Sequence, residues 1–416
     1  MYLTQVELID FRNYEHGSLA LAPGPNLLVG ANGQGKTNIV EAIAYLATLT
    51  SHRVATDAPL IRLGCEQAVI RARVVAGLED ARVLTLEIEI NPGRANRVRL
   101  NRVPQRRPRD LMGALRAVLF TPDDLAIVKG DPAERRGAVD DVVVQRWPRF
   151  AGVKADYDRV VRQRNALLKG VSSRGRLDAE TSANLDIWGE QLAVLGAELM
   201  LARAQTIADM RPHLERAYEA IAPTNNAVEV TYRPNVAALT QCLSDEAGAV
   251  STPIVPGEAG PASDEAGREQ IEADDVWPSS EEVVAALRQA LAERREDEVR
   301  RGVSLVGPHR DDIEMRIGPL PAKGYASHGE SWSLALSWRL AGFELLRQEG
   351  SEPVLLLDDV FAELDPVRRE RLASAIADAE QTVITAADEQ DVPHALRGKR
   401  FEVVAGTVTT LKHTST

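Results

Sequence analysis

The sequence predicts an α/β fold in which a nucleotide-binding core is assembled from both ends of the chain. The first observation is the run from Gly30 to Thr37, which fits the Gly-x4-Gly-Lys-Thr pattern of a phosphate-binding P-loop. The second is the segment from Val354 to Asp359, where four apolar residues lead into two carboxylates. More than 300 positions separate the two motifs. We therefore expect the ends of the chain to fold together, with the middle inserted between them.

The residues around the P-loop have the order that phosphate binding requires. Tyr2–Ile9 and Asn26–Val29 have strand patterns, and Lys36 to about Thr48 places its apolar residues on one helical face. In a strand–loop–helix unit, glycines let backbone N–H groups approach a phosphate, and the helix N-terminus adds partial positive charge. The expected nucleotide-binding residues are Gly30, Ala31, Asn32, Gly33, Gln34, Gly35, Lys36 and Thr37.

Four of the predicted site residues have distinct chemical roles. Lys36 is expected to reach the β- and γ-phosphates, and the Thr37 hydroxyl to ligate Mg²⁺. The apolar run before Asp358 predicts a buried parallel strand that ends where α/β folds place their ligands. Asp358 fits a Mg²⁺-organising position, and Asp359 could polarise an attacking water. ATP and Mg²⁺ are thus the predicted cofactors, and weak Mg²⁺-dependent ATP hydrolysis is the hypothesis for an activity.

A third motif extends the site beyond one subunit. Ser327-His328-Gly329-Glu330 opens a predicted helix about 30 residues ahead of the acidic strand, which is the signature-motif position of the ABC-type ATPases. In that class, the serine hydroxyl and helix N-terminus of one subunit contact the γ-phosphate bound by another. Ser327 and Gly329 are therefore expected to complete a nucleotide site in a second copy of the chain.

Further elements complete the predicted architecture. Val69–Val75 and Val83–Ile90 indicate an antiparallel β meander beside the core. Helical periodicity covers Ala155–Lys169, Asp186–Ile221 and Ser280–Arg301, and none of these sustains the heptads of a long coiled coil. Later strand candidates are Pro353–Leu357, Thr382–Thr385, Phe401–Val404 and Val408–Leu411.

The predicted fold is therefore an ABC-type P-loop ATPase lobe built from N- and C-terminal segments, with an adjoining antiparallel β subdomain. A mainly helical second domain without a long coiled coil is inserted into it. The predicted domain ranges are 1–119 for the first part of the ATPase domain, 120–300 for the helical domain, and 301–416 for the second part of the ATPase domain.

The net charge of −12 comes mostly from one segment. Residues 245–275 hold nine acidic residues against Arg268 alone and contribute −8, which leaves about −4 for the rest of the chain. The surrounding range 244–280 is rich in Gly, Pro, Ser and Ala, and it cannot bury enough apolar surface to offset its ordering entropy. It predicts a flexible acidic insertion between helices, with a partner-binding segment as the alternative.

Basic residues cluster elsewhere, so net charge is a poor guide to partners. Seven arginines on a predicted hairpin could neutralise DNA phosphates without reading sequence, or could form a solvated face balanced by nearby acids. No aromatic residue lies among them, which argues against base stacking. These arginines are Arg94, Arg97, Arg99, Arg102, Arg106, Arg107 and Arg109.

Composition also limits the location of the protein. The two cysteines, Cys65 and Cys242, favour neither a disulfide framework nor a metal site. No apolar run approaches 18 residues and the N-terminus has no signal-peptide pattern, so we expect a cytoplasmic protein without a membrane span.

Six ordered segments resemble one family, the bacterial RecF recombination mediators, over nearly the whole chain. These proteins are relatives of the SMC and Rad50 chromosome-maintenance ATPases. Four of the segments are Met1–Leu3 leading to Asp10–Tyr14, the P-loop, Phe120–Leu125 with Gly130–Arg136, and Val306–Asp312. The signature residues 327–330 and Leu355–Asp365 complete the resemblance.

The resemblance implies a cytoplasmic ATPase that forms a head-to-tail homodimer around two ATP molecules and binds single-stranded, duplex or gapped DNA. It further implies partnership with RecO and RecR, loading of RecA at gaps, replication restart and SOS induction. Slow hydrolysis would release the DNA. Arg12 matches a basic position that approaches the nucleotide in the wider class.

Two departures and several open roles accompany the resemblance. The signature ends in Glu330-Ser331-Trp332, where relatives often have Gln-Gln and a basic residue, and Trp332 is expected to pack rather than to contact a ligand. The segment up to Asp388 lacks the histidine of transporter ATPases. His309 could position the sheet near the nucleotide or could contact a phosphate or DNA, and Arg135 with Arg136 could contact DNA or form surface ion pairs. An ATPase subunit of a transport or other non-DNA assembly is the alternative function.

Overall fold

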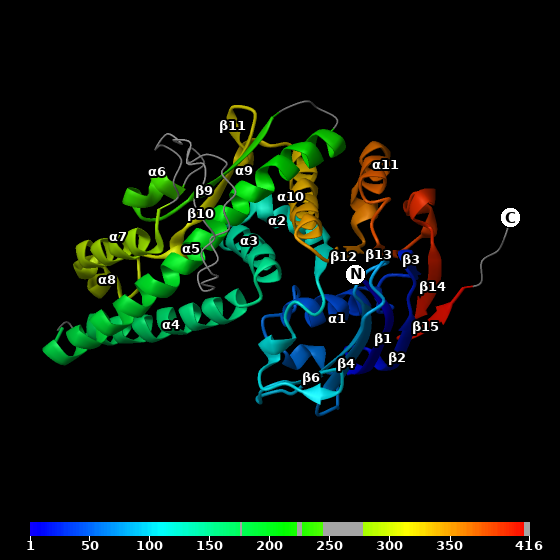
Figure 1. The fold of residues 1–416 in the computed structure, drawn as a ribbon, viewed down its shortest axis with the longest axis horizontal. Helices are drawn as coiled ribbons and strands as arrows, with labels where there is room; N and C mark the ends of the chain where they lie inside the picture. The colour runs from blue at the N-terminus through cyan, green and yellow to red at the C-terminus, as the bar shows by residue number, and fades with distance from the viewer. Residues whose placement is uncertain (175–176, 223–226, 244–277, 412–416) are drawn as a thin grey trace, which may run out of the picture. The chain divides into compact units, whose positions relative to one another are not determined.

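The computed structural model describes residues 1–174, 177–222, 227–243 and 278–411 (Figure 1). The chain forms two compact units. The first comprises residues 1–152, 209–230 and 315–416, and the second comprises residues 153–208 and 231–314. Because compact packing does not by itself define an independent domain, the boundaries at 119/120 and 300/301 stay a prediction. Most of the predicted acidic insertion, residues 244–277, lies outside the described residues.

A six-stranded sheet in the first unit joins the two ends of the chain. Its strand order is β15-β14-β3-β13-β12-β8, and all neighbours are parallel except β14 and β15. Strands from the blue N-terminal part and the orange to red C-terminal part thus lie side by side (Figure 1). The predicted assembly of one core from both ends is confirmed. The strands are β3 (Gly24–Val29), β8 (Ala117–Phe120), β12 (Val354–Asp358), β13 (Gln381–Ala386), β14 (Lys399–Val404) and β15 (Thr407–Thr410).

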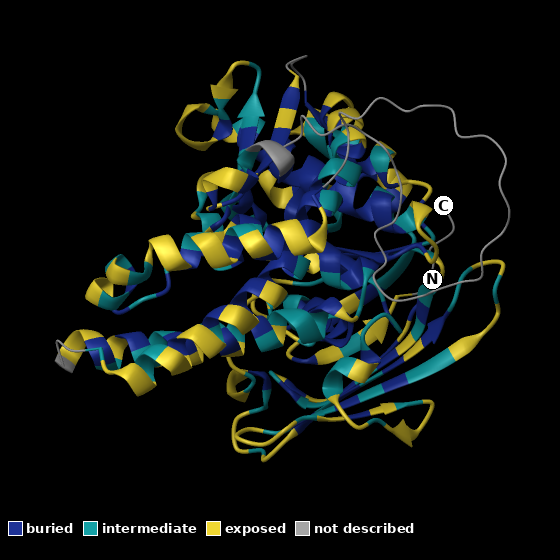
Figure 2. Ribbon diagram, turned by 60° about the vertical axis from the view of Figure 1, so that its left-hand side comes forward, coloured by how far each residue is buried: buried dark blue, intermediate teal, exposed yellow. Residues whose placement is uncertain are grey.

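Successive residues of this sheet supply two separate cores, because side chains alternate between its faces. On β12, the side chain of Leu356 packs into the core on one face of the sheet and that of Leu355 into the core on the other face, and both are fully buried. Each such leucine contributes roughly 1.5–3 kcal/mol by its burial. Figure 2 shows these buried layers in dark blue. None of the described helices is both long and apolar enough to cross a bilayer.

The first core is covered by helix α1 (Lys36–Thr48), whose bounds match the prediction, and by an antiparallel sheet of order β2-β1-β4-β5-β6-β7. The second core is covered by α10 (His328–Gln348) and α11 (Pro366–Ala375). Trp332 is 3% exposed within this core, as its predicted packing role requires. The antiparallel strands are β1 (Tyr2–Phe11), β2 (Tyr14–Ala20), β4 (Ala68–Val75), β5 (Val83–Ile90), β6 (Arg97–Leu100) and β7 (Val103–Pro104).

The predicted helices of the middle region are present, the first two with longer bounds and the third within the predicted Ser280–Arg301. The last of them is divided near Arg294 into α7 and α8. A third sheet has the order β11-β10-β9. The remaining elements are α2 (Leu125–Lys129), α3 (Pro132–Arg146), α4 (Phe150–Arg174), α5 (Ala179–Ile221), β9 (Val228–Arg233), α6 (Thr240–Leu243), α7 (Ser280–Glu293), α8 (Arg295–Arg301), β10 (Asp312–Ile317), β11 (Leu320–Pro321) and α9 (Ala322–Tyr325).

His309 lies within the second unit and is bound to protein groups. Its Nδ1 is 2.6 Å from the Tyr157 hydroxyl, and its Nε2 is 3.3 Å from the Ser304 carbonyl oxygen. The neighbouring Arg310 donates to the same Ser304 carbonyl. These contacts favour the structural one of the two roles considered for His309.

Candidate nucleotide-binding site

The P-loop connects β3 to α1 and is closely packed at two glycines. A Cβ on Gly30 would lie 2.2 Å from the Val403 carbonyl oxygen. Gly35 has a φ of +116°, and a Cβ there would lie 2.8 Å from both Asn13 Nδ2 and the Tyr14 hydroxyl. Only glycine fits these two positions, since a Cβ at either would collide with neighbouring backbone or side-chain atoms.

Two turns from opposite ends of the chain hold the loop in this shape. The Tyr14 hydroxyl donates to the Gly35 carbonyl at 3.0 Å, and Asn13 Nδ2 donates to the Gln34 carbonyl at 3.0 Å. From the C-terminal part, the Ala405 N–H donates to Gln34 Oε1 at 2.7 Å. Burial raises the pKa of Tyr14, so its hydroxyl remains a donor at neutral pH. The loop is therefore fixed by the β1–β2 and β14–β15 turns together.

Lys36 begins α1 and is buried against the loop itself. Its side-chain nitrogen donates to the carbonyl oxygens of Gly30 at 2.7 Å and Ala31 at 3.2 Å, and the residue is 3% exposed. A buried ammonium needs acceptors. Here the loop supplies them, so the cation is held at the phosphate-binding element rather than in solvent.

The two halves of the predicted site meet at Asp358. Its Oδ1 accepts hydrogen bonds from the Thr37 hydroxyl at 3.0 Å and from the Thr385 hydroxyl at 2.7 Å. Thr37 follows the P-loop lysine, whereas Asp358 ends β12 and Thr385 lies on the adjacent strand β13. Parallel pairing of β12 with β13 places Asp358 opposite Thr385, which explains this meeting.

Burial is the main cause that raises the pKa of Asp358, and the neighbouring Asp359 adds to it. The hydrogen bonds from Thr385 and Thr37 oppose this shift. Asp359 itself has a φ of +51°, and its N–H donates to the Thr385 hydroxyl at 2.9 Å. A non-glycine residue in the left-handed region is uncommon, and such strain concentrates at functional sites.

We predict that Asp358→Asn raises the melting temperature of the nucleotide-free protein by a few degrees at pH 7 to 8. A carboxyl whose folded pKa is raised binds its proton more tightly in the folded state. Its destabilising effect therefore develops as the pH rises through the folded pKa and is complete above it. The amide keeps the acceptor for Thr37 and Thr385 but carries no charge, so the stability that the buried carboxylate charge costs should be regained. Thermal unfolding between pH 5 and 8 measures the difference.

Asp378→Asn is the control for this prediction, because the side chain of Asp378 is 71% exposed. Its melting temperature should stay within about one degree of the wild type, as expected for a surface substitution. A lower melting temperature for Asp358→Asn across the whole pH range would contradict the assigned cost of the buried charge.

The residues present fit a Mg²⁺–nucleotide. The glycine-rich backbone at the N-terminus of α1 can bind a phosphate through its N–H groups, and Lys36 adds a buried cation. A hydroxyl and a carboxylate, from Thr37 and Asp358, are the hard oxygen ligands that Mg²⁺ prefers, with the remaining positions left to phosphate and water. The fit rests on side chains brought together from both ends of the chain.

Arg12 lies near this site but is engaged with protein atoms. It forms a two-point ion pair with Glu41 of α1, with N···O distances of 2.8 and 2.6 Å, and Nη1 donates to the Pro59 carbonyl. Burial would raise the pKa of Glu41, but hydrogen bonds from Arg12 and Ser51 outweigh it and lower the pKa. The nucleotide contact expected for Arg12 stays a prediction.

Ser327 and Gly329 lie at the start of α10. The Ser327 hydroxyl accepts from the Glu330 N–H at 3.2 Å and donates to the Glu330 carboxylate at 2.7 Å, which forms a capping box. A Cβ on Gly329 would lie 2.6 Å from an Arg368 guanidinium nitrogen. Among the described residues, no hydrogen bond or ion pair joins Ser327 or Gly329 to residues 30–37.

The structure thus brings Lys36, Thr37, Asp358 and Asp359 into one site and leaves the signature residues outside its hydrogen bonds. Asn13 and Thr385 support the site but were not among the predicted site residues, and the bonds of the predicted Gln34 to Asn13 and Ala405 were not expected. The Asn13-Tyr14 pair lay within a recognised segment, so its position was a usable signal. Nothing in the local sequence around Thr385 indicates its bond to Asp358, because that contact depends on strand register.

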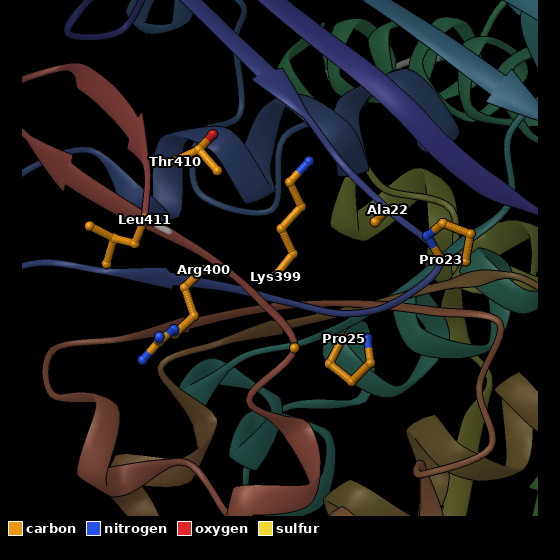
Figure 3. A pocket seen from close by; sticks show the side chains of 8 residues that line it. Ala22, Pro23, Pro25, Lys399, Arg400, Thr410 and Leu411 are labelled. Carbon is orange, nitrogen blue, oxygen red and sulfur yellow. The ribbon is translucent and has the colours of Figure 1, made fainter. Parts of the chain in front are cut away.

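A separate pocket of about 430 Å³ lies at the amino ends of β3 and β14, at the opposite edge of the sheet from the P-loop (Figure 3). Lys399 and Arg400 extend in different directions from this edge. Lys399 donates to the Ala20 carbonyl at 2.6 Å, and Arg400 pairs with Glu389 at 2.9 Å. Because the pocket lies at the amino ends of the strands and the P-loop follows the carboxyl end of β3, this pocket is not part of the nucleotide site.

Comparison with known proteins agrees with this geometry. The family described as RecF/RecN/SMC N terminal domain matches residues 2–410. The DNA replication and repair protein RecF of Cutibacterium acnes is 51% identical over 409 residues, which cover 98% of each chain. RecF of Streptomyces avermitilis is 48% identical over 410 residues, covering 98% of this chain and 99% of that protein.

Solved structures show the same fold. The recombination mediator protein RecF with ATP, of the RecFOR pathway, aligns with a TM-score of 0.79 at 25% identity and covers 99% of this chain and 98% of that chain. An Smc head domain of Pyrococcus furiosus aligns with a TM-score of 0.50 at 15% identity, covering 99% and 96% of the two chains. The ABC-type ATPase fold predicted from the sequence is therefore confirmed. Taken together, the family match and the close relatives show that the chain belongs to the RecF family of DNA replication and repair proteins.

Proposed function

We propose that the chain is an ATP-gated DNA-binding protein of recombinational repair, in which ATP joins two copies head to tail. The observation that carries this proposal is the division of the site: Lys36 and Asp358 belong to one cluster, whereas Ser327 makes no hydrogen bond to it. A site with its signature helix elsewhere is what a composite dimer site requires. The aligned RecF structure, which contains ATP, supports the choice of nucleotide.

Within one copy, the side chains have separable roles. Lys36 would exchange its loop carbonyls for phosphate oxygens, and this exchange keeps its charge paired throughout. Thr37 and Asp358 would ligate Mg²⁺, which supplies charge neutralisation on the phosphates. Asp359 would orient an attacking water and accept its proton, because it adjoins the metal ligand and is held by Thr385.

The second copy would contribute the N-terminus of α10. Ser327 and Gly329 lie at the start of this 21-residue helix, where backbone N–H groups and the helix dipole favour an anion. To reach a phosphate, the Ser327 hydroxyl must first release the Glu330 carboxylate to which it now donates. The Glu330 carboxylate thus competes with phosphate for the Ser327 hydroxyl and repels the phosphate as a like charge, which fits slow turnover, with hydrolysis acting as a switch that releases DNA.

The wider pathway follows from the family. A recombination mediator of the RecFOR pathway and the DNA replication and repair proteins to which the chain is similar support a role in repair. We further propose action at DNA gaps with RecO and RecR as partners, and RecA loading, replication restart and SOS induction as consequences. The alternative of a transport ATPase subunit is left without support by membership of the RecF family.

We predict that ATP with Mg²⁺ strengthens DNA binding at least about tenfold, because only the joined pair presents two DNA-contacting surfaces at once. Mobility shifts on single-stranded, duplex and gapped DNA, each with and without ATP and across a salt series, measure this effect. A protein that binds DNA equally well without nucleotide would contradict ATP gating. A protein that binds no DNA in any condition would contradict the proposed function.

A further inference from the structure

Six of the seven arginines between positions 94 and 109 fall into a paired and an unpaired set, and the seventh, Arg109, is only partly exposed. Arg97 and Arg99 lie on β6 directly opposite Glu89 and Glu87 of β5, and each forms an ion pair with its opposite residue. Glu87 also pairs with Arg71 of β4 at 2.5 Å. These charges belong to a cross-strand ladder and are neutralised within the sheet.

The unpaired set is exposed at the edge of the same sheet. Arg94, Arg102, Arg106 and Arg107 are all exposed, and in the described part of the chain their guanidinium groups form no ion pair or hydrogen bond. The alternative considered from the sequence, a face balanced by acids, therefore holds for Arg97 and Arg99 but not for these four.

Backbone pairing places three of the four at one end of the edge hairpin. Arg94 is in the turn that precedes β6, while β7 runs antiparallel to β6 with Leu100 opposite Val103. The Gln105 N–H then donates to the Val98 carbonyl at 3.0 Å, so the chain continues past Gln105 toward the start of β6. Arg106 and Arg107 therefore lie toward the Arg94 end. Arg102 is in the turn at the other end.

Three carboxylates lie around the Arg94 end of the hairpin, and each accepts a hydrogen bond or forms an ion pair within the protein. Glu89 pairs with Arg97, and Asp57 accepts from Asn96 at 2.8 Å. Asp110 accepts from the Arg107 backbone N–H at 3.0 Å and caps the short helix that follows. Only Glu89 is neutralised by an ion pair, because Asp57 and Asp110 accept from neutral N–H groups and keep their charge. The three guanidinium groups toward this end of the hairpin outnumber these two carboxylates, although the net charge of the chain is −12. Such a local excess attracts anions despite the overall charge.

We propose that Arg94, Arg106 and Arg107, here called the arginine cluster, form a contact surface for the phosphate backbone of duplex DNA. This inference rests on the proposed DNA-binding function and assigns part of the DNA contact to the arginine cluster. Guanidinium groups pair with phosphate oxygens in two-point contacts. No aromatic residue occurs between positions 91 and 110, so the surface offers phosphate contact without base stacking.

The experiment compares two charge-matched triple variants of the full chain with ATP and Mg²⁺. One is Arg94→Gln, Arg106→Gln, Arg107→Gln. The control is Arg82→Gln, Arg288→Gln, Arg300→Gln, which removes three exposed arginines that are each paired with an acid. Duplex affinity is measured from about 50 to 300 mM salt. Each phosphate contact adds about 0.9 to the slope of log K against log salt.

The cluster variant should lower that slope by about 2 to 3 and weaken binding at least about tenfold near 100 mM salt. The control variant should keep the wild-type slope, and both should bind a fluorescent ATP analogue like the wild type. Wild-type DNA binding with an unchanged slope in the cluster variant would overturn the inference alone. Absence of DNA binding by the wild type would overturn the proposed function and this inference with it.

Discussion

Replacing Lys36 with alanine should weaken ATP binding at least about 100-fold. Lys36 is 3% exposed and its ammonium is held by the Gly30 and Ala31 carbonyls, so it is positioned at the loop before any ligand arrives. Each charge-assisted hydrogen bond is worth about 1.5–3 kcal/mol. The loss of two such bonds to phosphate oxygens therefore amounts to about 3 kcal/mol or more, which corresponds to a factor of about 100 in affinity.

Titration calorimetry with Mg²⁺–ATP measures this loss. Lys169→Ala provides the control, because Lys169 is an exposed lysine of α4 in the second unit and should leave affinity unchanged. Circular dichroism verifies that both variants are folded. Retention of wild-type affinity by a folded Lys36→Ala protein would mean that the loop is not the phosphate site.

Replacing Ser327 with arginine should abolish ATP-dependent dimerisation and leave ATP binding by the separate copy intact. The new guanidinium would lie at the positive N-terminus of α10, close to Arg368, which already lies 2.6 Å from a Cβ position on Gly329. It would also remove the hydroxyl that is proposed to meet the phosphate of the other copy. Sedimentation with and without ATP follows the change in mass.

The chain contains a matched control for the lost helix cap. Ser279 caps α7 through a capping box with Glu282, in the same arrangement as Ser327 with Glu330. Both substitutions should cost about 1 kcal/mol of stability. Only Ser327→Arg should affect dimerisation. Equal loss of dimerisation in Ser279→Arg would indicate a general folding effect, and dimerisation by Ser327→Arg would remove the signature helix from the interface.

The P-loop and the strand before Asp358 could be predicted from the sequence, because neighbouring residues determine their conformation. The P-loop contains its own turn residues and helix start, and the apolar run before Asp358 identifies a buried strand by its composition. The cap at Ser327 was also accessible, since Ser-x-x-Glu before an apolar run is a capping-box pattern. In each case neighbouring residues decide the conformation.

Contacts that depend on strand order could not be predicted in the same way. Thr385 meets Asp358 only because β13 pairs with β12 in one particular register. Strand β2 was missed because its alternation is interrupted by Gly17, where a Cβ would lie 2.8 Å from the Tyr14 ring. The sequence likewise left open which arginines form ion pairs with acids. The register of β5 and β6 decides this, because it places Arg97 opposite Glu89.

A mixture of two inactive variants shows whether each nucleotide site is completed by a second copy. Lys36→Ala lacks a working P-loop and Ser327→Arg lacks a working signature helix. One mixed pair would therefore still contain one intact site, formed by the P-loop of the second variant and the α10 N-terminus of the first. We predict that each variant alone sediments as a monomer with Mg²⁺–ATP and that the mixture forms a heterodimer with one bound nucleotide. A mixture that stays monomeric while the wild type dimerises, or a dimer formed by either variant alone, would contradict the account.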